Sequence, residues 1–407
     1  MVWLVGLMQG VAARALEEKI YKPEVRTVLC YPEGVLNAYP VYELGSRQRL
    51  VLEFDNLTGQ YREYHCQIVH CDRFWNPSPL YPLQYREGLE SEVIDDVTYS
   101  SATFVQYSHY RYRFPSEQMR PTRAGNYALI VFENGDVTDT VLVRRFYVVD
   151  KRVEVSGKVR APALPRYAFS HQDVRLSVDY SALGRPAQPS DFGVVVRQNK
   201  AWMTERQLVP TSAGGNRLEF DYAYEDAFYF PGLHEWRAFD ARSVRTARFH
   251  VRKVEYDGEY HLRLYPDEPR RSLPYSFTED NNGDYFVLTE GGSLQVSPDY
   301  VWVHFRLQRW RPDGGVPYVF GGLTDWRLLP EARMQYQAGE WRGRLQVKQG
   351  YYDYMYVVQR ADGTVDLTAI EGTHFETENN YLVLVYYREP QLGVDELVGW
   401  LVLSSGE

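Results

Sequence analysis

Short runs in which apolar and polar residues alternate recur along almost the whole chain. Clear examples are "RLVLEFDNL" (49–57), "YREYHCQIV" (61–69) and "YALIVFENGD" (127–136), each of strand length and each bounded by turn residues. Successive side chains of a β-strand point to opposite faces, so this alternation predicts strands with one face in a core. No segment shows a helical period beyond a turn or two, and 34 tyrosines and nine tryptophans suit the half-buried face of a sheet. The sequence therefore predicts an all-β protein.

Three successive units are expected, because 407 residues exceed one ordinary domain and the strand pattern restarts twice. The first β-sandwich is predicted to span residues 24–150. A second spans 151–254 and contains, near the domain join, the irregular connection "KVRAPALPRYAF" (158–169) with its two prolines. The third spans 255–407 and includes the run "NYLVLVYYR" (380–388). The expected architecture is thus a tandem array of β-sandwich domains.

The N-terminal residues 1–15 have a different character. The stretch "VWLVGLMQGVAARA" (2–15) is a short apolar run ending in Ala13-Arg14-Ala15, which is typical of a secretory signal cleaved after Ala15. The positive residues that usually precede such a run are missing, so a buried N-terminal segment is the alternative interpretation. No later run approaches the ~18 to 20 continuous apolar residues of a spanning helix, so we expect no direct membrane insertion. An exported chain would enter an oxidising compartment.

Composition and motifs argue against several kinds of chemistry. A formal net charge of −9 disfavours nucleic acid, whose binding depends on clustered lysine and arginine. The sequence has no glycine-rich phosphate loop and no nucleophile elbow. The stretch "EDNNGD" (279–284) resembles a calcium loop but lacks the terminal glutamate, and Glu371 with Glu376 is a carboxylate pair in loop-like surroundings. A polar hairpin and solvated acids are the simpler interpretations, so we expect neither an enzyme nor a cofactor.

The stretch "YHCQIVHCD" (64–72) concentrates two histidines and two of the three cysteines. At ~3.3 Å per residue, Cys66 and His70 would lie roughly 13 Å apart on one face of a strand, whereas zinc needs each donor within ~2.3 Å. Cys66 and Cys71 differ by an odd number of positions, so they are expected to point to opposite faces. The spacing thus argues against a metal site and against a disulfide between these two cysteines.

A long segment resembles a known family. "HCDRFWNPSPLYPLQYREGLESEVIDDVTYSSATFVQYSHYRYRFP" (70–115), followed by "AGNYALIVF" (124–132), is similar to the N-terminal domain of the type IX secretion system plug proteins of Bacteroidetes-type bacteria. The resemblance continues in order through "VVRQNKAW" (195–202), "KQGYYDYMYVV" (348–358) and "DELVGW" (395–400). It therefore covers nearly the whole mature chain.

This resemblance implies a periplasmic protein that closes the inner opening of a large outer-membrane translocon β-barrel while no cargo is exported. The barrel would be its partner, and sealing a pore requires a complementary surface rather than a reaction. Trp75, Tyr107 and Tyr110 are candidate anchors of that interface, since tryptophan and tyrosine bury large areas at small entropic cost. Ordinary packing within the sandwich is the alternative role for each of them.

A second resemblance supports a competing hypothesis. The segment 318–363 is similar to a glycogen-binding carbohydrate module, which is an immunoglobulin-like sandwich, and Trp326 and Trp341 stand near positions where such modules stack sugars. This similarity implies immunoglobulin-like domains, with glycan binding in the cell envelope as the alternative function. An exposed Trp326 on a flat platform would favour that alternative.

Cys30 and Cys66 are additions to the plug-family signature. In an oxidising periplasm these two cysteines, on candidate strands of one domain, are able to pair and leave Cys71 as a buried free thiol. A Cys30–Cys66 disulfide is therefore predicted, with three free thiols as the alternative.

Overall fold

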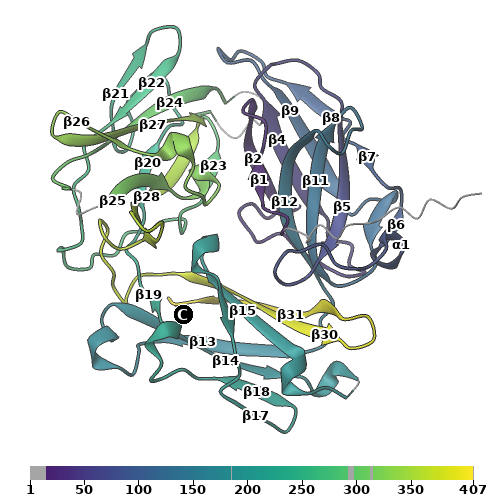
Figure 1. Cartoon of the computed structure of the whole chain (residues 1–407). Coiled ribbons are helices and arrows are strands. Elements are labelled where there is room, and N and C mark those ends of the chain that lie inside the picture. The colour runs from purple at the N-terminus through teal and green to yellow at the C-terminus, as the bar shows by residue number, and fades with distance from the viewer. Residues whose placement is uncertain (1–14, 185, 292–297, 312–314, 407) are drawn as a thin grey trace, which may run out of the picture.

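The computed structural model describes residues 15–184, 186–291, 298–311 and 315–406, so the predicted signal segment 1–15 lies outside the described residues except for Ala15. Strands dominate, which confirms the all-β prediction, and the chain forms three lobes around a common centre (Figure 1). The described residues contain one α-helix of a single turn, α1(Pro82–Tyr85). Short 3-10 helices are η1(Pro165–Tyr167), η2(Ser181–Leu183), η3(Pro189–Asp191), η4(Trp202–Thr204), η5(Asp226–Phe228), η6(Gly322–Thr324) and η7(Pro330–Ala332). No described helix has the length and apolar character needed to cross a membrane.

The first domain is a sandwich of two antiparallel-rich sheets. One sheet has the order β1(Lys19–Ile20), β12(Thr140–Val149), β11(Gly125–Glu133), β5(Tyr64–Cys71), β7(Glu92–Val93), with β3(Val41–Glu43) parallel to β12. The other has the order β2(Val25–Pro32), β4(Leu50–Asn56), β9(Ser108–Phe114), β8(Asp96–Tyr99), and a small hairpin pairs β6(Arg86–Gly88) with β10(Met119–Pro121). The predicted alternation places Leu50, Leu52 and Phe54 in the core between them.

The second domain is also a sandwich, but it is assembled from two separate parts of the chain. One sheet has the order β13(Glu154–Arg160), β14(His171–Asp179), β18(Arg217–Phe220), β17(Ser212–Gly214), with β19(Phe230–Pro231) on β14. The other has the order β16(Arg206–Leu208), β15(Phe192–Gln198), β30(Asn380–Glu389), β31(Val394–Ser404). The last two strands of the chain therefore complete this domain.

The third domain is inserted between those two parts. One sheet has β20(Arg237–Asp240), β28(Gly350–Arg360) and β23(Tyr285–Val287), with β25(Gly315–Phe320) and β29(Val365–Asp366) also on β28. The other has the order β21(Val251–Tyr256), β22(Tyr260–Leu264), β24(Tyr300–Leu307), β27(Glu340–Lys348), β26(Gln335–Gln337). Its core includes Phe239, Val303, Phe305 and Tyr354.

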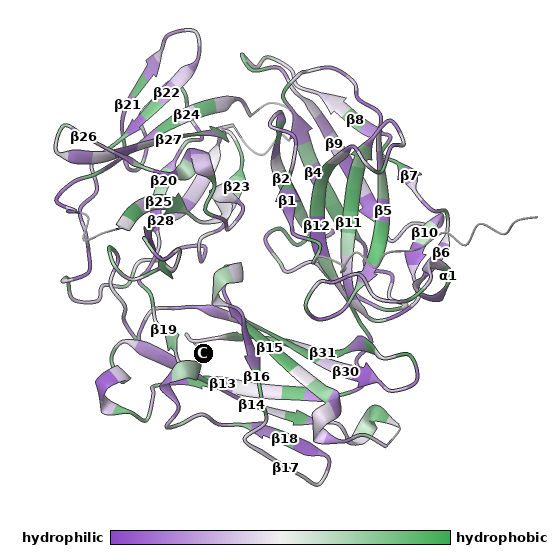
Figure 2. Cartoon of the chain, in the orientation of Figure 1, coloured by the Kyte–Doolittle hydropathy of each residue, from purple (hydrophilic) through white to green (hydrophobic). Residues whose placement is uncertain are grey.

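The expected boundaries 151–254 and 255–407 differ from this arrangement. β20 lies before residue 254 yet pairs with β28, and β30 pairs with β15 along its length, from Phe192↔Tyr387 to Gln198↔Tyr381. The physical reason lies in the apolar run of β30. Tyr381, Val383 and Val385 face the core of the second domain, whereas Leu382, Leu384 and Tyr386 face the first domain. β30 is therefore a wall buried on both sides, and Figure 2 shows the apolar character of this strand and of β11 and β12.

Candidate functional site at the domain junctions

The first and second domains meet across an apolar junction. Ala128, Ile130 and Val143 of the first domain pack with Leu382, Leu384 and Leu397 of the second in one buried cluster. Tyr386 Oη donates a hydrogen bond to Asn126 Oδ1 at 2.8 Å within this junction. Burial of this much hydrocarbon contributes roughly 25 cal/mol per Å² of apolar area removed from water. The two domains are therefore held together as one body.

Trp75 is the aromatic centre of this junction. The Asp72 carboxylate accepts hydrogen bonds from the backbone N–H groups of Phe74 and Asn76, both at 2.9 Å, and so forms a tight turn. The turn holds Trp75 at a φ of 69° and aims its ring at Trp202 of the second domain, with ring centres 5.8 Å apart. The Arg145 guanidinium lies 4.5 Å from the Trp75 ring, which adds a cation–π contact.

The first and third domains meet through a buried ion pair. Lys348 Nζ, at the end of β27, lies 2.6 Å from Asp55 Oδ2 on β4, and the two residues are only 2% and 1% exposed. Tyr300 Oη donates to Asp55 Oδ2 at 2.6 Å, and His109 Nδ1 lies 2.7 Å from Asp55 Oδ1. Burial lowers the pKa of Lys348, although the Asp55 carboxylate opposes this effect. Lys348 and Asp55 thus form a buried ion pair between the first and third domains.

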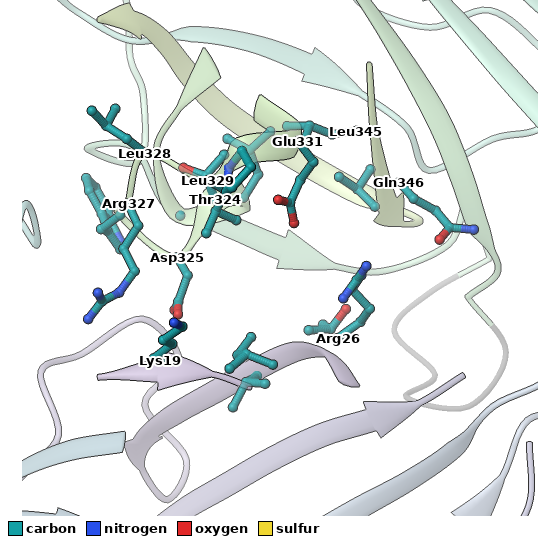
Figure 3. Close-up of a pocket in the computed structure, with 18 of the residues that line it drawn as sticks. Lys19, Arg26, Thr324, Asp325, Arg327, Leu328, Leu329, Glu331, Leu345 and Gln346 are labelled. Atoms are coloured by element: carbon teal, nitrogen blue, oxygen red, sulfur yellow. The ribbon is translucent and has the colours of Figure 1, made fainter. Parts of the chain in front are cut away.

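A cleft of about 750 Å³ lies beside this ion pair, between the first and third domains. In Figure 3 the strands carrying Lys19 and Arg26 form one wall, and the segment around Asp325 with Leu345 and Gln346 of β27 forms the opposite wall. Arg144 of β12 also lines the cleft and donates to Asp325 Oδ1 at 3.0 Å. Its volume is within the ~300 to 1,000 Å³ typical of ligand sites.

The aromatic residues predicted as partner anchors are buried within the chain. Trp75 contacts the second domain, and Tyr107 Oη donates to Pro298 O of the third domain at 2.9 Å. Tyr110 lies in the first core, where its hydroxyl accepts from Arg62 N at 2.7 Å. The prediction that they contact an external partner is therefore corrected: Trp75 and Tyr107 join domains, and Tyr110 packs inside one.

The tryptophans proposed for sugar stacking are also buried. Trp326 is 7% exposed and packs edge-on against Trp236 and Phe320, and Trp341 is 6% exposed and donates from Nε1 to Trp310 O at 3.1 Å. Trp326 follows Asp325, and both have a φ of 56°, so this turn directs the ring into the core. Neither ring offers the flat exposed platform that the carbohydrate hypothesis requires.

The three cysteines are free thiols, so the predicted Cys30–Cys66 disulfide is corrected. Cys30 lies on β2 near Glu18 and Arg144, whereas Cys66 lies on β5 beside Tyr112, so the two thiols occupy different surroundings. Cys66 belongs to the first core and Cys71 to the junction with the second domain, which confirms that they point to opposite faces of β5. Burial raises the pKa of each thiol, which keeps it protonated and unreactive.

The two acidic motifs of the third domain form hydrogen bonds and ion pairs with other parts of the chain. In the calcium-like stretch, Asp280 accepts from the backbone N–H of Trp236 and of Asn282, and Asp284 pairs with Lys200 of the second domain at 2.8 Å. Glu371 is fully buried and accepts from Arg237 and Arg270. Among the described residues, no group of three His, Cys, Asp or Glu side chains is arranged to hold a metal.

The Glu371 cluster predicts loss of stability in acid. Burial alone would raise the pKa of Glu371, but the guanidinium groups of Arg237 and Arg270, 3.0 and 2.8 Å away, hold it at about 2 instead of its usual 4.5. Above pH ~4.5 this ionised carboxylate stabilises the folded state by about 3 kcal/mol, and the stabilisation disappears as the pH falls toward 2. Urea unfolding between pH 5 and 2.5 should show a shallower pH dependence for Glu371→Gln than for the exposed control Glu154→Gln. Equal slopes for the two variants would contradict the assignment.

A model of the family described as "Type 9 secretion system plug protein 1st domain" matches residues 25–150. The match runs from the start of β2 to the residue after β12 and so spans the first sandwich. The first domain of the chain therefore belongs to the type IX secretion plug family. This is a family of secretion-system plugs rather than a known enzyme family.

The chain also resembles a solved structure over nearly its whole length. The crystal structure of a hypothetical protein from Parabacteroides merdae has 25% sequence identity and a TM-score of 0.92, and the match covers 96% of this chain and 100% of that one. No curated protein matches the sequence. Because the likeness extends well beyond residues 25–150, the three-domain arrangement is shared with that relative.

Sequence reasoning missed the ion pairs that connect the domains. Asp55 and Lys348 are 293 residues apart, and Arg144 and Asp325 are 181 residues apart. Each lies in a strand or turn that the local pattern describes well, but nothing local indicates its partner. The alternation in "RLVLEFDNL" places Asp55 on the face away from the core of its own domain, so no local signal marks it as a buried, paired acid.

Proposed function

We propose that this protein is a periplasmic plug that closes the periplasmic opening of the type IX secretion translocon barrel in the outer membrane while the barrel carries no cargo. The family match over residues 25–150 is the observation that carries the proposal. The partner is the large translocon β-barrel, and the N-terminal residues 1–15 act as the export signal. The glycan-binding alternative has no support from the buried Trp326 and Trp341.

The architecture supports this role physically. A plug must keep its shape while it is bound to a large pore. Here an apolar junction and a buried ion pair hold the three domains together. Such a role requires no catalytic group. It requires instead an exposed surface that matches the rim or the interior of the barrel.

The family-matched domain offers exposed apolar side chains for that surface. Tyr81 and Leu83 are 77% and 90% exposed at the one-turn helix α1, and Phe74 and Leu89 flank them at 50% each. Exposed apolar side chains of this size are unfavourable in water, and their burial by a partner lowers the free energy. We propose that they contact the barrel in place of the buried Trp75, Tyr107 and Tyr110.

Copurification and outer-membrane permeability test the proposal together. The tagged chain is expected to copurify with the barrel, and its deletion is expected to admit large antibiotics that the intact outer membrane excludes. The double variant Tyr81→Ser/Leu83→Ser should fold normally but copurify less, whereas Tyr224→Ser, at an 80% exposed site in the second domain, should behave as wild type. An intact permeability barrier in the deletion strain, with no barrel in the purified fraction, would refute the plug role.

A further inference from the structure

β27 presents an unpaired edge to the cleft between the first and third domains. Strand β26 pairs with β27 only from Glu340 to Arg342, and among the described residues no strand pairs with that edge farther along. The five consecutive residues Arg344 to Lys348 all line the cleft. Their side chains alternate between the two faces of the sheet, so all five reach the same cleft only because the strand edge itself faces it.

This edge differs from the strand edges that proteins usually protect. On the opposite wall, β2 carries a register shift between Arg26 and Leu29, and Thr27 has a φ of 51°, so a bulge interrupts that edge. β27, by contrast, pairs in continuous register with β24 from Trp341 to Lys348. A regular strand with a free edge is a template onto which an extended peptide adds as a further strand.

The charge of the cleft indicates what kind of peptide fits. Seven lysines and arginines line it against three acidic residues, although the whole chain carries a net charge of −9. Four of the seven cations are paired: Lys22 with Asp139, Arg144 with Asp325, Arg327 with Glu17 and Lys348 with Asp55. No ion pair with a described carboxylate involves Lys19, Arg26 or Arg344, and Arg344 instead lies 4.7 Å from the Trp302 ring.

We propose that this cleft binds an extended acidic peptide as an added strand along β27. Its backbone would pair with Arg344 to Lys348, a length of about 16 Å, and its carboxylates would approach Arg26 from one wall and Arg344 from the other. Arg26 points from β2 toward the wall that carries Leu345 and Gln346 (Figure 3). The inference does not depend on the barrel as partner, because it concerns a site on the isolated chain.

The test uses a fluorescein-labelled octapeptide that alternates glutamate with valine and threonine, and the purified full chain. Fluorescence anisotropy at low salt is expected to show saturable binding that weakens as salt increases. The double variant Arg26→Glu/Arg344→Glu should weaken binding about tenfold or more. Lys158→Glu/Arg160→Glu, at exposed positions on β13 of the second domain, changes the net charge equally and should leave the affinity unchanged.

Two further peptides separate strand addition from charge alone. A peptide with lysine in place of glutamate should not bind. Peptides N-methylated at alternate amides, in both registers, keep every charge but cannot form a full ladder, so one register should lose binding. Equal binding of both methylated peptides and the parent, equal weakening by the two double variants, or no binding of the acidic peptide would each overturn the proposal, and none of these outcomes bears on copurification with the barrel.

Discussion

Lys348→Met is expected to lower the free energy of unfolding by about 3 to 5 kcal/mol, because it leaves the Asp55 carboxylate buried without its counter-charge. The methionine fills a similar volume, so the loss reflects charge rather than a cavity. Asp55 is 1% exposed, so bulk solvent does not replace the ammonium group as its partner. Urea unfolding followed by far-UV circular dichroism measures the loss.

Two companion variants make this result specific. Lys158→Met removes an exposed lysine on β13 and should change the unfolding free energy by less than about 0.5 kcal/mol. Asp55→Asn combined with Lys348→Met removes both charges and should recover much of the stability, because no buried charge is left. If Lys348→Met and Lys158→Met unfold at the same urea concentration, the ion pair does not brace the junction.

Trp75→Ala is expected to cost about 3 to 5 kcal/mol, since it empties the centre of the apolar junction between the first and second domains. The ring contacts Tyr147 and Trp202 and is covered by the Arg145 guanidinium, so its removal unpacks both domains. The same urea titration, read by circular dichroism, measures the change.

The neighbouring residue supplies the matched control. Phe74 is 50% exposed, so Phe74→Ala removes a ring of comparable kind from the same turn with a change of about 0.5 kcal/mol or less. A Trp75→Ala protein as stable as Phe74→Ala would show that Trp75 does not hold the junction together.

The alternation of apolar and polar residues predicted those features of the fold that depend on the geometry of a single strand. The strand β5 and the opposite orientations of Cys66 and Cys71 follow from parity along one strand, and the structure has both. The run 380–388 predicted a strand, but neither its burial on both faces nor its pairing with β15, because pairing depends on residues almost 200 positions away.

The exposure of the candidate site residues could not be predicted for a related reason. Exposure of an aromatic ring depends on what lies above it, and the strand pattern shows only which rings share a face. The carbohydrate alternative required Trp326 on an exposed platform, but the backbone turn at Asp325 and Trp326 directs the ring against Trp236, which precedes β20. Asp55 reads as a solvated outward acid, yet every residue of β4 is buried because the third domain covers that face.

β30 is buried between the first and second domains, and this position has a consequence for how the two domains fold. The first domain is continuous in sequence, whereas the second requires β30 and β31, Asn380–Ser404, which lie far along the chain from β15. Until these strands pair, β15 lacks its neighbour and the apolar face of β11 and β12 stays open to water. Such long-range pairing is slow and exposes aggregation-prone edges. The pairing of β30 with β15 is therefore expected to form late in folding, and a chain cut before residue 380 would lose the wall that two domains share.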